Sequence, residues 1–246
     1  MISQEKDLGD EGFTLVEMLV AMVVVFMLLG ATMSALVTST GIVKTISQLQ
    51  NVNEEARLAL NRMARDLRQA TSVVTAVNPD GPGFSSTRLV GIRVKADFDG
   101  DGCIGGVAPA GSSPTCLPYN SSNPEDISYC YEPWTRQLYV IDNQATPPVV
   151  PLSPSSINCA GGQVLAGNLG ALTIEYRSNS YRHDVNPSDG VTTWRELDQA
   201  ASPVGNANGL LDTELATIDS VVVDLTMTVD SRSQTYRTQV DLRNAS

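Results

Sequence analysis

The sequence predicts an α+β protein in which one long N-terminal helix packs on an antiparallel β-sheet domain. Three observations predict this fold class. An apolar run from Met18 to Val43 contains no ionisable side chain, and an amphipathic segment continues it without a break. From Val73 onward, short strand-like segments alternate with clusters of Gly, Pro, Ser and Asn. Proline is absent from residues 13–70, so the strongest helix-breaking residue does not interrupt the helix.

The apolar half of this helix is long enough to cross a membrane. Twenty residues from Met18 span about 30 Å as a helix, which is the thickness of the hydrocarbon core of a bilayer. Glu17 lies at the start of the run, where a carboxylate costs less than the roughly 2.5–3.5 kcal/mol expected near the centre. We expect a cation as its partner. A cut between Gly12 and Phe13 would create an α-amine at the depth of Glu17 on a neighbouring subunit.

The sequence GFTLVE at residues 12–17, followed by this run, resembles the cleavage and methylation motif of type IV prepilins and of type II secretion pseudopilins. The resemblance implies that a prepilin peptidase cuts after Gly12 and that Phe13 becomes the N-methylated first residue. It also implies that Glu17 guides assembly with other pilin or pseudopilin subunits through the N-terminal helix. An ordinary membrane anchor or a secretory signal is the alternative. A secretory signal, however, has its small-residue cleavage site after the apolar run.

The chain accordingly divides into four expected parts. They are a prepilin leader at 1–12, a transmembrane and assembly half-helix at 13–43, an amphipathic outer half-helix at 44–72 and a β-rich extracytoplasmic domain at 73–246. The resemblance places the chain in the inner membrane as a single-pass protein and then in a pilus or pseudopilus.

The outer half-helix has one apolar stripe. Its members recur every three or four residues: Ile46, Leu49, Val52, Ala56, Leu60, Met63, Leu67 and Ala70. The charged residues are expected on the opposite, solvated face: Glu54, Glu55, Arg57, Arg62, Arg65, Asp66 and Arg68. The stripe needs a sheet to cover it.

Six segments of the following domain are predicted as strands: Leu89–Lys95, Ile127–Tyr131, Gln137–Ile141, Ala171–Arg177, Ser220–Val229 and Thr235–Arg243. The sections 103–125, 145–163 and 178–210 are predicted as loops. The segments IEYR at 174–177, SYCYEP and RQLYVID at 128–142, and QVDLRN at 239–244 resemble PilW-type minor pilins and the J-type minor pseudopilin of type II secretion.

Four cysteines follow the membrane segment, and an even count in an exported domain indicates two disulfides with three possible pairings. We expect the neighbours to pair, Cys103 with Cys116 and Cys130 with Cys159.

A calcium loop is a further hypothesis. Asp97, Asp99 and Asp101 alternate ahead of a glycine, as carboxylates do in the first half of an EF-hand loop. The twelfth position is Ala108 in place of the bidentate glutamate, so the coordination shell is incomplete. A solvated Asp-Gly turn is the alternative, and no cofactor is expected to be required.

The net charge of −11 disfavours direct nucleic-acid binding, because such a surface repels phosphate groups. His183 is the only histidine and has no partner in any recognisable catalytic pattern, so we do not expect an enzyme. The sequence predicts a structural subunit, a minor pilin or pseudopilin that primes or caps a filament. The alternative is a filament-borne adhesion or uptake module that binds through disulfide-stapled loops.

Overall fold

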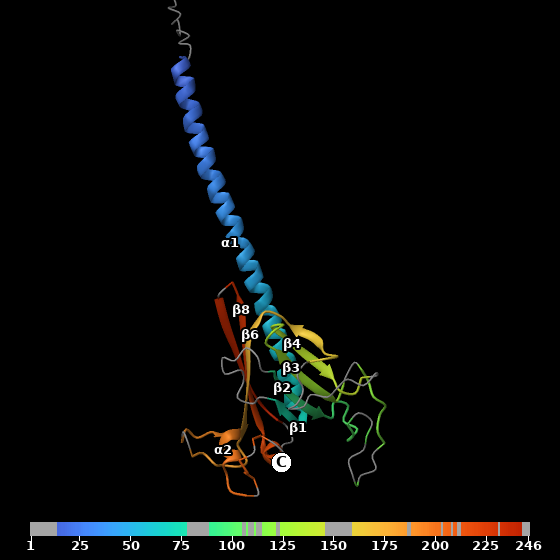
Figure 1. The fold of residues 1–246 in the computed structure, drawn as a ribbon. Coiled ribbons are helices and arrows are strands. Elements are labelled where there is room, and N and C mark those ends of the chain that lie inside the picture. The colour runs from blue at the N-terminus through green and yellow to red at the C-terminus, as the bar shows by residue number, and fades with distance from the viewer. Residues whose placement is uncertain are drawn as a thin grey trace, which may run out of the picture. The chain divides into compact units, whose positions relative to one another are not determined.

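The computed structural model describes residues 14–77, 89–104, 107, 111, 115–121, 124–145, 159–185, 188–202, 204–207, 209–210, 213–230 and 232–242. The chain forms two compact units, Met1–Leu49 and Gln50–Ser246. Helix α1 (Leu15–Gln69) begins in the first unit and ends in the second (Figure 1).

The part of α1 in the first unit is apolar and exposed. Leu15 is 82% exposed, and Phe26 and Val37 are each 70% exposed. Four of its hydroxyls, those of Thr32, Thr38, Ser39 and Thr40, bond within the helix, where they donate to carbonyl oxygens three or four residues earlier at 2.8–3.0 Å. Such internal bonding suits a helix surrounded by lipid, where water cannot bond the hydroxyls.

The part of α1 in the second unit buries the expected apolar stripe. The buried residues recur every three or four positions: Val52, Ala56, Ala59, Leu60, Met63, Ala64 and Leu67. The expectation for Asp66 is wrong, because this side chain is 1% exposed and accepts a hydrogen bond from the Tyr129 hydroxyl at 2.6 Å. Asp66 lies three residues after Met63 and four before Ala70, which places it on the buried face. Ile46 is 49% exposed and lies in the first unit.

Five antiparallel strands form the first sheet, and their spatial order follows the chain: β1 (Ala70–Val77), β2 (Val90–Ala96), β3 (Asp126–Glu132), β4 (Gln137–Asp142) and β5 (Gln163–Ala166). Tyr129 in β3 pairs with Ile92 on one side and Val140 on the other. These pairings align the core-facing side chains of three adjacent strands.

The second sheet has the order β7-β6-β8-β9, again with antiparallel neighbours. Its strands are β6 (Leu169–Ser178), β7 (Thr192–Thr193), β8 (Ser220–Val229) and β9 (Arg232–Asp241). Two short helices, α2 (Trp194–Asp198) and α3 (Thr213–Thr217), complete the described elements. One hydrophobic core contains buried side chains from the outer part of α1 and from both sheets.

The structure thus has the α+β class and the long helix that the sequence predicts, and each of the six predicted strands has a counterpart. It differs in three respects. The helix ends at Gln69, so residues 70–72, expected in the helix, begin β1. The short strands β5 and β7 and the helix α2 fall in or at the edge of predicted loops. The antiparallel strands form two sheets rather than one.

Candidate functional site

The N-terminal motif enters the described structure at Thr14, so Gly12 and Phe13 lie outside the described residues. Glu17 lies in the first turn of α1 and is exposed. Its carboxylate oxygen Oε2 accepts hydrogen bonds from the Thr14 backbone N–H and from the Thr14 hydroxyl, both at 3.1 Å. Glu17 therefore has a partner within its own chain at the start of the apolar run.

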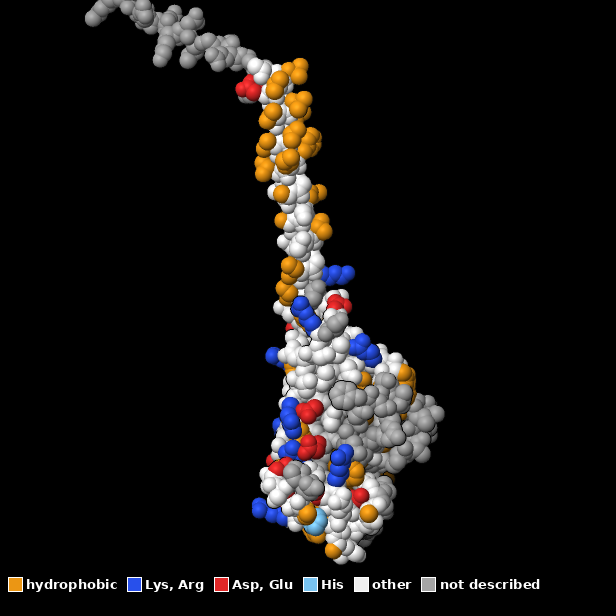
Figure 2. Space-filling view, turned by 60° about the vertical axis from the view of Figure 1, so that its left-hand side comes forward, with side chains coloured by type: hydrophobic (Ala, Val, Ile, Leu, Met, Phe, Trp, Pro, Cys, Tyr) orange, Lys and Arg blue, Asp and Glu red, His pale blue; other side chains and the backbone are white. Residues whose placement is uncertain are grey.

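The apolar surface that follows Glu17 surrounds the helix. Figure 2 shows hydrophobic side chains around the N-terminal part of α1. Among the described residues, α1 is the one helix long and apolar enough to cross a membrane. The window of α1 that meets this test is not buried inside the protein. A surface of this size needs an apolar environment, either lipid or other helices.

Residues 9–33 match the family model of the prokaryotic N-terminal methylation motif. With a long N-terminal helix and antiparallel sheets, the protein has an α+β, pilin-like architecture. The chain carries a type IV pilin-like prepilin motif, which implies processing by a prepilin peptidase and pilin-type assembly. No curated protein sequence matches this chain.

The loop after β2 holds its aspartates against its own backbone. Asp97 accepts hydrogen bonds from the N–H groups of Gly100 at 2.7 Å and Gly102 at 2.9 Å. Asp101 accepts from the N–H groups of Cys103, at 2.7 Å, and of Leu117. The bond from Leu117 is the main cause of the lowered pKa of the Asp101 carboxyl. Asp101 thereby joins the two ends of the loop that Cys103 and Cys116 close.

The three carboxylates that converge in this region are Asp97, Asp99 and Glu125, whose ligand oxygens lie within 4.8 Å of one another. Asp101, the third aspartate of the predicted calcium loop, is not in this group. The structure brings in Glu125 from a separate segment, which the sequence pattern did not identify. These oxygens are ligands that Ca²⁺ accepts, and calcium binding stays a prediction.

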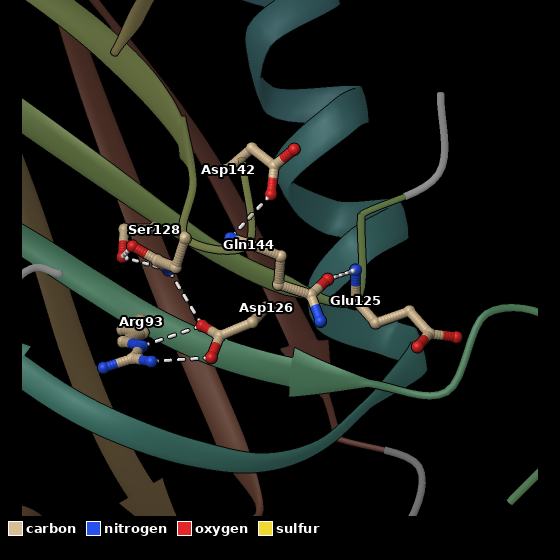
Figure 3. Close-up of polar contacts among 7 residues, drawn as sticks. Arg93, Glu125, Asp126, Ser128, Asp142 and Gln144 are labelled. Atoms are coloured by element: carbon tan, nitrogen blue, oxygen red, sulfur yellow. Dashed lines mark hydrogen bonds and ion pairs between the residues drawn. The ribbon is translucent and has the colours of Figure 1, made fainter. Parts of the chain in front are cut away.

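Glu125 is held in place through its backbone. Its N–H donates to the side chain of Gln144 at 3.0 Å, and its carbonyl oxygen accepts from the Ala96 N–H at 2.9 Å. Gln144 is fixed in turn, because its N–H donates to Asp142 at 2.9 Å (Figure 3). The end of β4 thus positions the third carboxylate beside the Asp97 loop.

An ion pair lies next to this contact on β2 and β3. The Arg93 guanidinium donates twice to Asp126, at 2.7 Å and 2.6 Å, and the two side chains face one another in Figure 3. The Asp126 hydrogen bond is the main reason that the pKa of Arg93 is raised. Asn143 also donates to Asp126, at 2.8 Å, and to the buried Ser128 hydroxyl, at 2.9 Å. We interpret this network as structural support for the loop.

Both disulfides have the expected pairing. Cys103 is bonded to Cys116 with a Cα–Cα distance of 5.6 Å, and Cys130 is bonded to Cys159 with a distance of 5.8 Å. Cys130 and Cys159 lie in a small buried cluster that also contains Leu89 and Ile141. The first bond closes the loop next to the Asp97 cluster, and the second ties the segment before β5 to the centre of the first sheet.

His183 is held in place through its backbone. Its backbone N–H donates to the Thr192 hydroxyl at 3.0 Å, which ties the segment after β6 to β7.

A cavity of about 380 Å³ is lined by residues that include Arg62, Tyr119, Asp142 and Gln163. At the wall of this cavity the Tyr119 hydroxyl donates a hydrogen bond to the Asp142 carboxylate. Burial, together with this hydrogen bond, raises the pKa of Tyr119 to about 12.

Proposed function

We propose that this chain is a minor pilin or pseudopilin, a structural subunit that primes or caps the assembly of a type IV pilus or a type II secretion pseudopilus. The chain is inserted in the inner membrane through the first half of α1, with its second unit on the extracytoplasmic side. A prepilin peptidase trims it after Gly12, and it then joins other subunits through the N-terminal helix.

The observation that carries the proposal is the setting of Glu17. Glu17 lies within the prepilin motif, and no ionisable side chain occurs from Met18 to Val43. A carboxylate beside such a surface is a functional feature by default, since an acid at this depth costs free energy without a partner. The α-amine that cleavage creates on Phe13 of a neighbouring subunit has the complementary charge.

The absence of proline from residues 13–70 supports the minor or pseudopilin assignment over a major pilin, since the major subunits that the motif resembles often carry a proline in this stretch. The folded second unit, with its own core and two disulfides, supports a subunit that presents a stable domain outside the membrane.

The first arm of the experiment concerns processing. Replacing Gly12 by a bulkier residue, as in Gly12→Leu, is expected to leave a full-length precursor in the inner membrane, because the motif implies a small residue before the cut. Immunoblots of fractionated membranes measure this. Trimming of G12L at the wild-type rate contradicts the cleavage site.

The second arm concerns assembly. Glu17→Ala is expected to be processed normally, because a more apolar segment inserts at least as well, and to enter sheared filaments at least tenfold less than wild type. That factor corresponds to about 1.4 kcal/mol of lost pairing. Wild-type amounts of E17A in filaments contradict the role of Glu17.

A further inference from the structure

The cavity of about 380 Å³ is lined by residues of α1, of the segment before β3, of β4 and of β5. Pro124 and Val140 supply apolar surface, whereas Arg62 and Asp142 supply charge. Ligand pockets in proteins have volumes of about 300–1,000 Å³ and combine an apolar lining with a few polar groups. The cavity therefore has the size and the composition of a site for a small organic molecule.

Arg62 is a cation at the cavity wall with unused hydrogen-bonding capacity. Its Nε lies 3.9 Å from Asp66 Oδ2, which is too long for a hydrogen bond, and no described residue accepts a hydrogen bond from Arg62. Asp66 is already engaged, because it accepts from the Tyr129 hydroxyl at 2.6 Å and from Arg65 at 2.9 Å. The Arg62 side chain is 37% exposed, so a ligand can reach it. A guanidinium presents a fork of N–H donors that matches a carboxylate.

Asp142 is the anion of the same cavity, and the groups that bond it are neutral. Its Oδ1 accepts from the Gln144 N–H at 2.9 Å (Figure 3), and its Oδ2 accepts from the Tyr119 hydroxyl. An ionised carboxylate has about four lone-pair sites, so about two of them stay available. Among the described residues, no Lys, Arg or His forms an ion pair with Asp142, and the ion-pair partner of Arg62 is Asp66.

We infer that this cavity is a binding site for a small zwitterion of the α-amino acid class. The carboxylate of the ligand pairs with the Arg62 guanidinium, and its ammonium group pairs with the Asp142 carboxylate. The side chain of the ligand lies against the apolar lining that Pro124 and Val140 supply. The inference goes beyond the proposed function and does not depend on it, because the lining residues belong to the second unit and the prepilin motif belongs to the first.

A zwitterion fits the two charges better than a simple anion or a simple cation does. A carboxylate without an ammonium group is repelled by Asp142, and an amine without a carboxylate is repelled by Arg62. A ligand that covers either residue removes water from it, and this desolvation costs free energy unless the ligand supplies the opposite charge. Selectivity for a molecule that carries both charges is therefore the property to measure.

The first experiment is isothermal titration calorimetry of the full-length chain in lipid nanodiscs, with alanine, leucine and phenylalanine as probes. The tightest binder is compared with its own deaminated and decarboxylated forms, which for leucine are isocaproate and isoamylamine. We expect the amino acid to bind about tenfold more tightly than either half-ligand. No heat from any of the three amino acids at millimolar concentration overturns the inference, and so does a half-ligand that binds as tightly as the amino acid.

The second experiment repeats these titrations with variants of the two charged residues. Asp142→Asn is expected to weaken amino-acid binding about tenfold while the carboxylate half-ligand binds at least as well as to wild type, because the repelling acid is gone. Arg62→Gln should weaken amino-acid binding equally and spare the amine half-ligand. Arg57→Gln and Asp230→Asn change exposed residues outside the lining and should stay within about twofold of wild type.

The pattern across ligands separates lost pairing from a damaged fold. Amino-acid binding by D142N and R62Q within about twofold of wild type would overturn the inference. A uniform loss of all three ligands in both variants would overturn the assigned pairing as well. The comparison of half-ligands uses the wild-type chain, so it decides the question even where a variant does not fold.

Discussion

At the scale of single residues, the aspartates of the Asp97 loop divide into two groups by whether they join the acidic cluster. Asp101 is engaged with the N–H groups of Cys103 and Leu117, so it holds the loop closed. Asp99 bonds the Asp101 N–H at 3.1 Å and also lies in the acidic cluster with Asp97 and Glu125. We therefore expect calcium binding to depend on Asp97, Asp99 and Glu125 more directly than on Asp101.

This division leads to a prediction about calcium. Chelator-stripped protein is expected to gain thermal stability in millimolar Ca²⁺, because a ligand that binds only the folded state stabilises it. Asp99→Asn and Glu125→Gln should abolish the gain, whereas Asp241→Asn, which changes an exposed acid on β9, should keep it. Differential scanning calorimetry measures the shift. A titration without heat and a melting temperature that calcium does not change would remove the cluster from consideration.

Some residues of this region could be predicted from the sequence, and others could not. Asp97 and Asp99 were predictable from their alternation in one short segment. Glu125 was not, because the contact depends on the hydrogen bonds of its backbone to Gln144 and Ala96. Asp66 was misplaced for a similar reason, since the burial of an acid depends on a donor such as Tyr129 that is remote in the sequence. The pattern T-x-x-E at Thr14–Glu17 was a local signal of a capping box at the start of α1, but the cleavage motif occupies the same residues.

At the scale of elements, the turn between β3 and β4 joins the two sheets. Arg136 in this turn has a positive φ of 56°. Its side chain donates to the carbonyl oxygens of Leu169 at 3.1 Å and Thr228 at 2.9 Å, which belong to β6 and β8. Tyr131 in β3 adds a bond from its hydroxyl to the Gly170 carbonyl oxygen at 3.2 Å.

Removal of this link should weaken the fold measurably. Arg136→Ala is expected to lower the free energy of unfolding by about 1–2 kcal/mol, because two hydrogen bonds from a charged donor are lost at a partly exposed site. Arg232→Ala, an exposed arginine on β9, is the control and should change it by less than about 0.5 kcal/mol. Chemical denaturation measures both. Equal effects of the two variants would show that Arg136 does not join the sheets.

The disulfides give a second prediction for these elements. Peptide mapping by mass spectrometry without reduction should find both links and no free thiol in protein from its native compartment. Removal of the buried Cys130–Cys159 bond, by replacing both residues with alanine, is expected to cost about 2–5 kcal/mol of stability. A link between Cys103 and Cys159 would contradict the pairing.

The strands that the sequence predicted and those that it missed differ in length and setting. The strands β3, β4, β6 and β8 have strong apolar or β-branched patterns over six or more residues, which a pattern can identify. Strand β1 has a sequence rich in β-branched residues, ATSVVTAV, but it follows the helix directly. Because the apolar stripe of the helix continues to Ala70, the first residues of β1 were assigned to the helix. Strands β5 and β7 have four and two residues, and their existence depends on pairing with β4 and β6.

At the scale of the whole molecule, buried tyrosines determine how stability responds to alkali. Burial raises the pKa values of Tyr129, Tyr131 and Tyr176 above the ordinary value of 10, and the hydroxyl of Tyr129 also faces the charge of Asp66. Tyr119 has a pKa of about 12. In the folded protein these groups keep their protons at a pH where the unfolded chain loses them.

The sign of the pH dependence follows from this difference. Below pH 10 both states carry the protons, and the free energy of unfolding does not depend on these groups. Above about pH 10 the unfolded state releases protons and the folded state does not, so stability falls as pH rises. Denaturation curves from pH 8 to about pH 11 should show the fall, and Tyr176→Phe should make it shallower. Stability that stays constant across pH 10 would contradict the burial of these tyrosines.

The connectivity of the disulfides has a consequence for how the protein matures. Each cysteine is bonded to its neighbour in the sequence, over separations of 13 and 29 residues. In the proposed topology the first half of α1 stays in the membrane and the chain that follows it is translocated in sequence order, so Cys103 and Cys116 reach the oxidising compartment before Cys130 and Cys159. An oxidase that joins cysteines in the order of their arrival then produces the native bonds directly. Maturation of this subunit should therefore require a thiol oxidase but no disulfide isomerase.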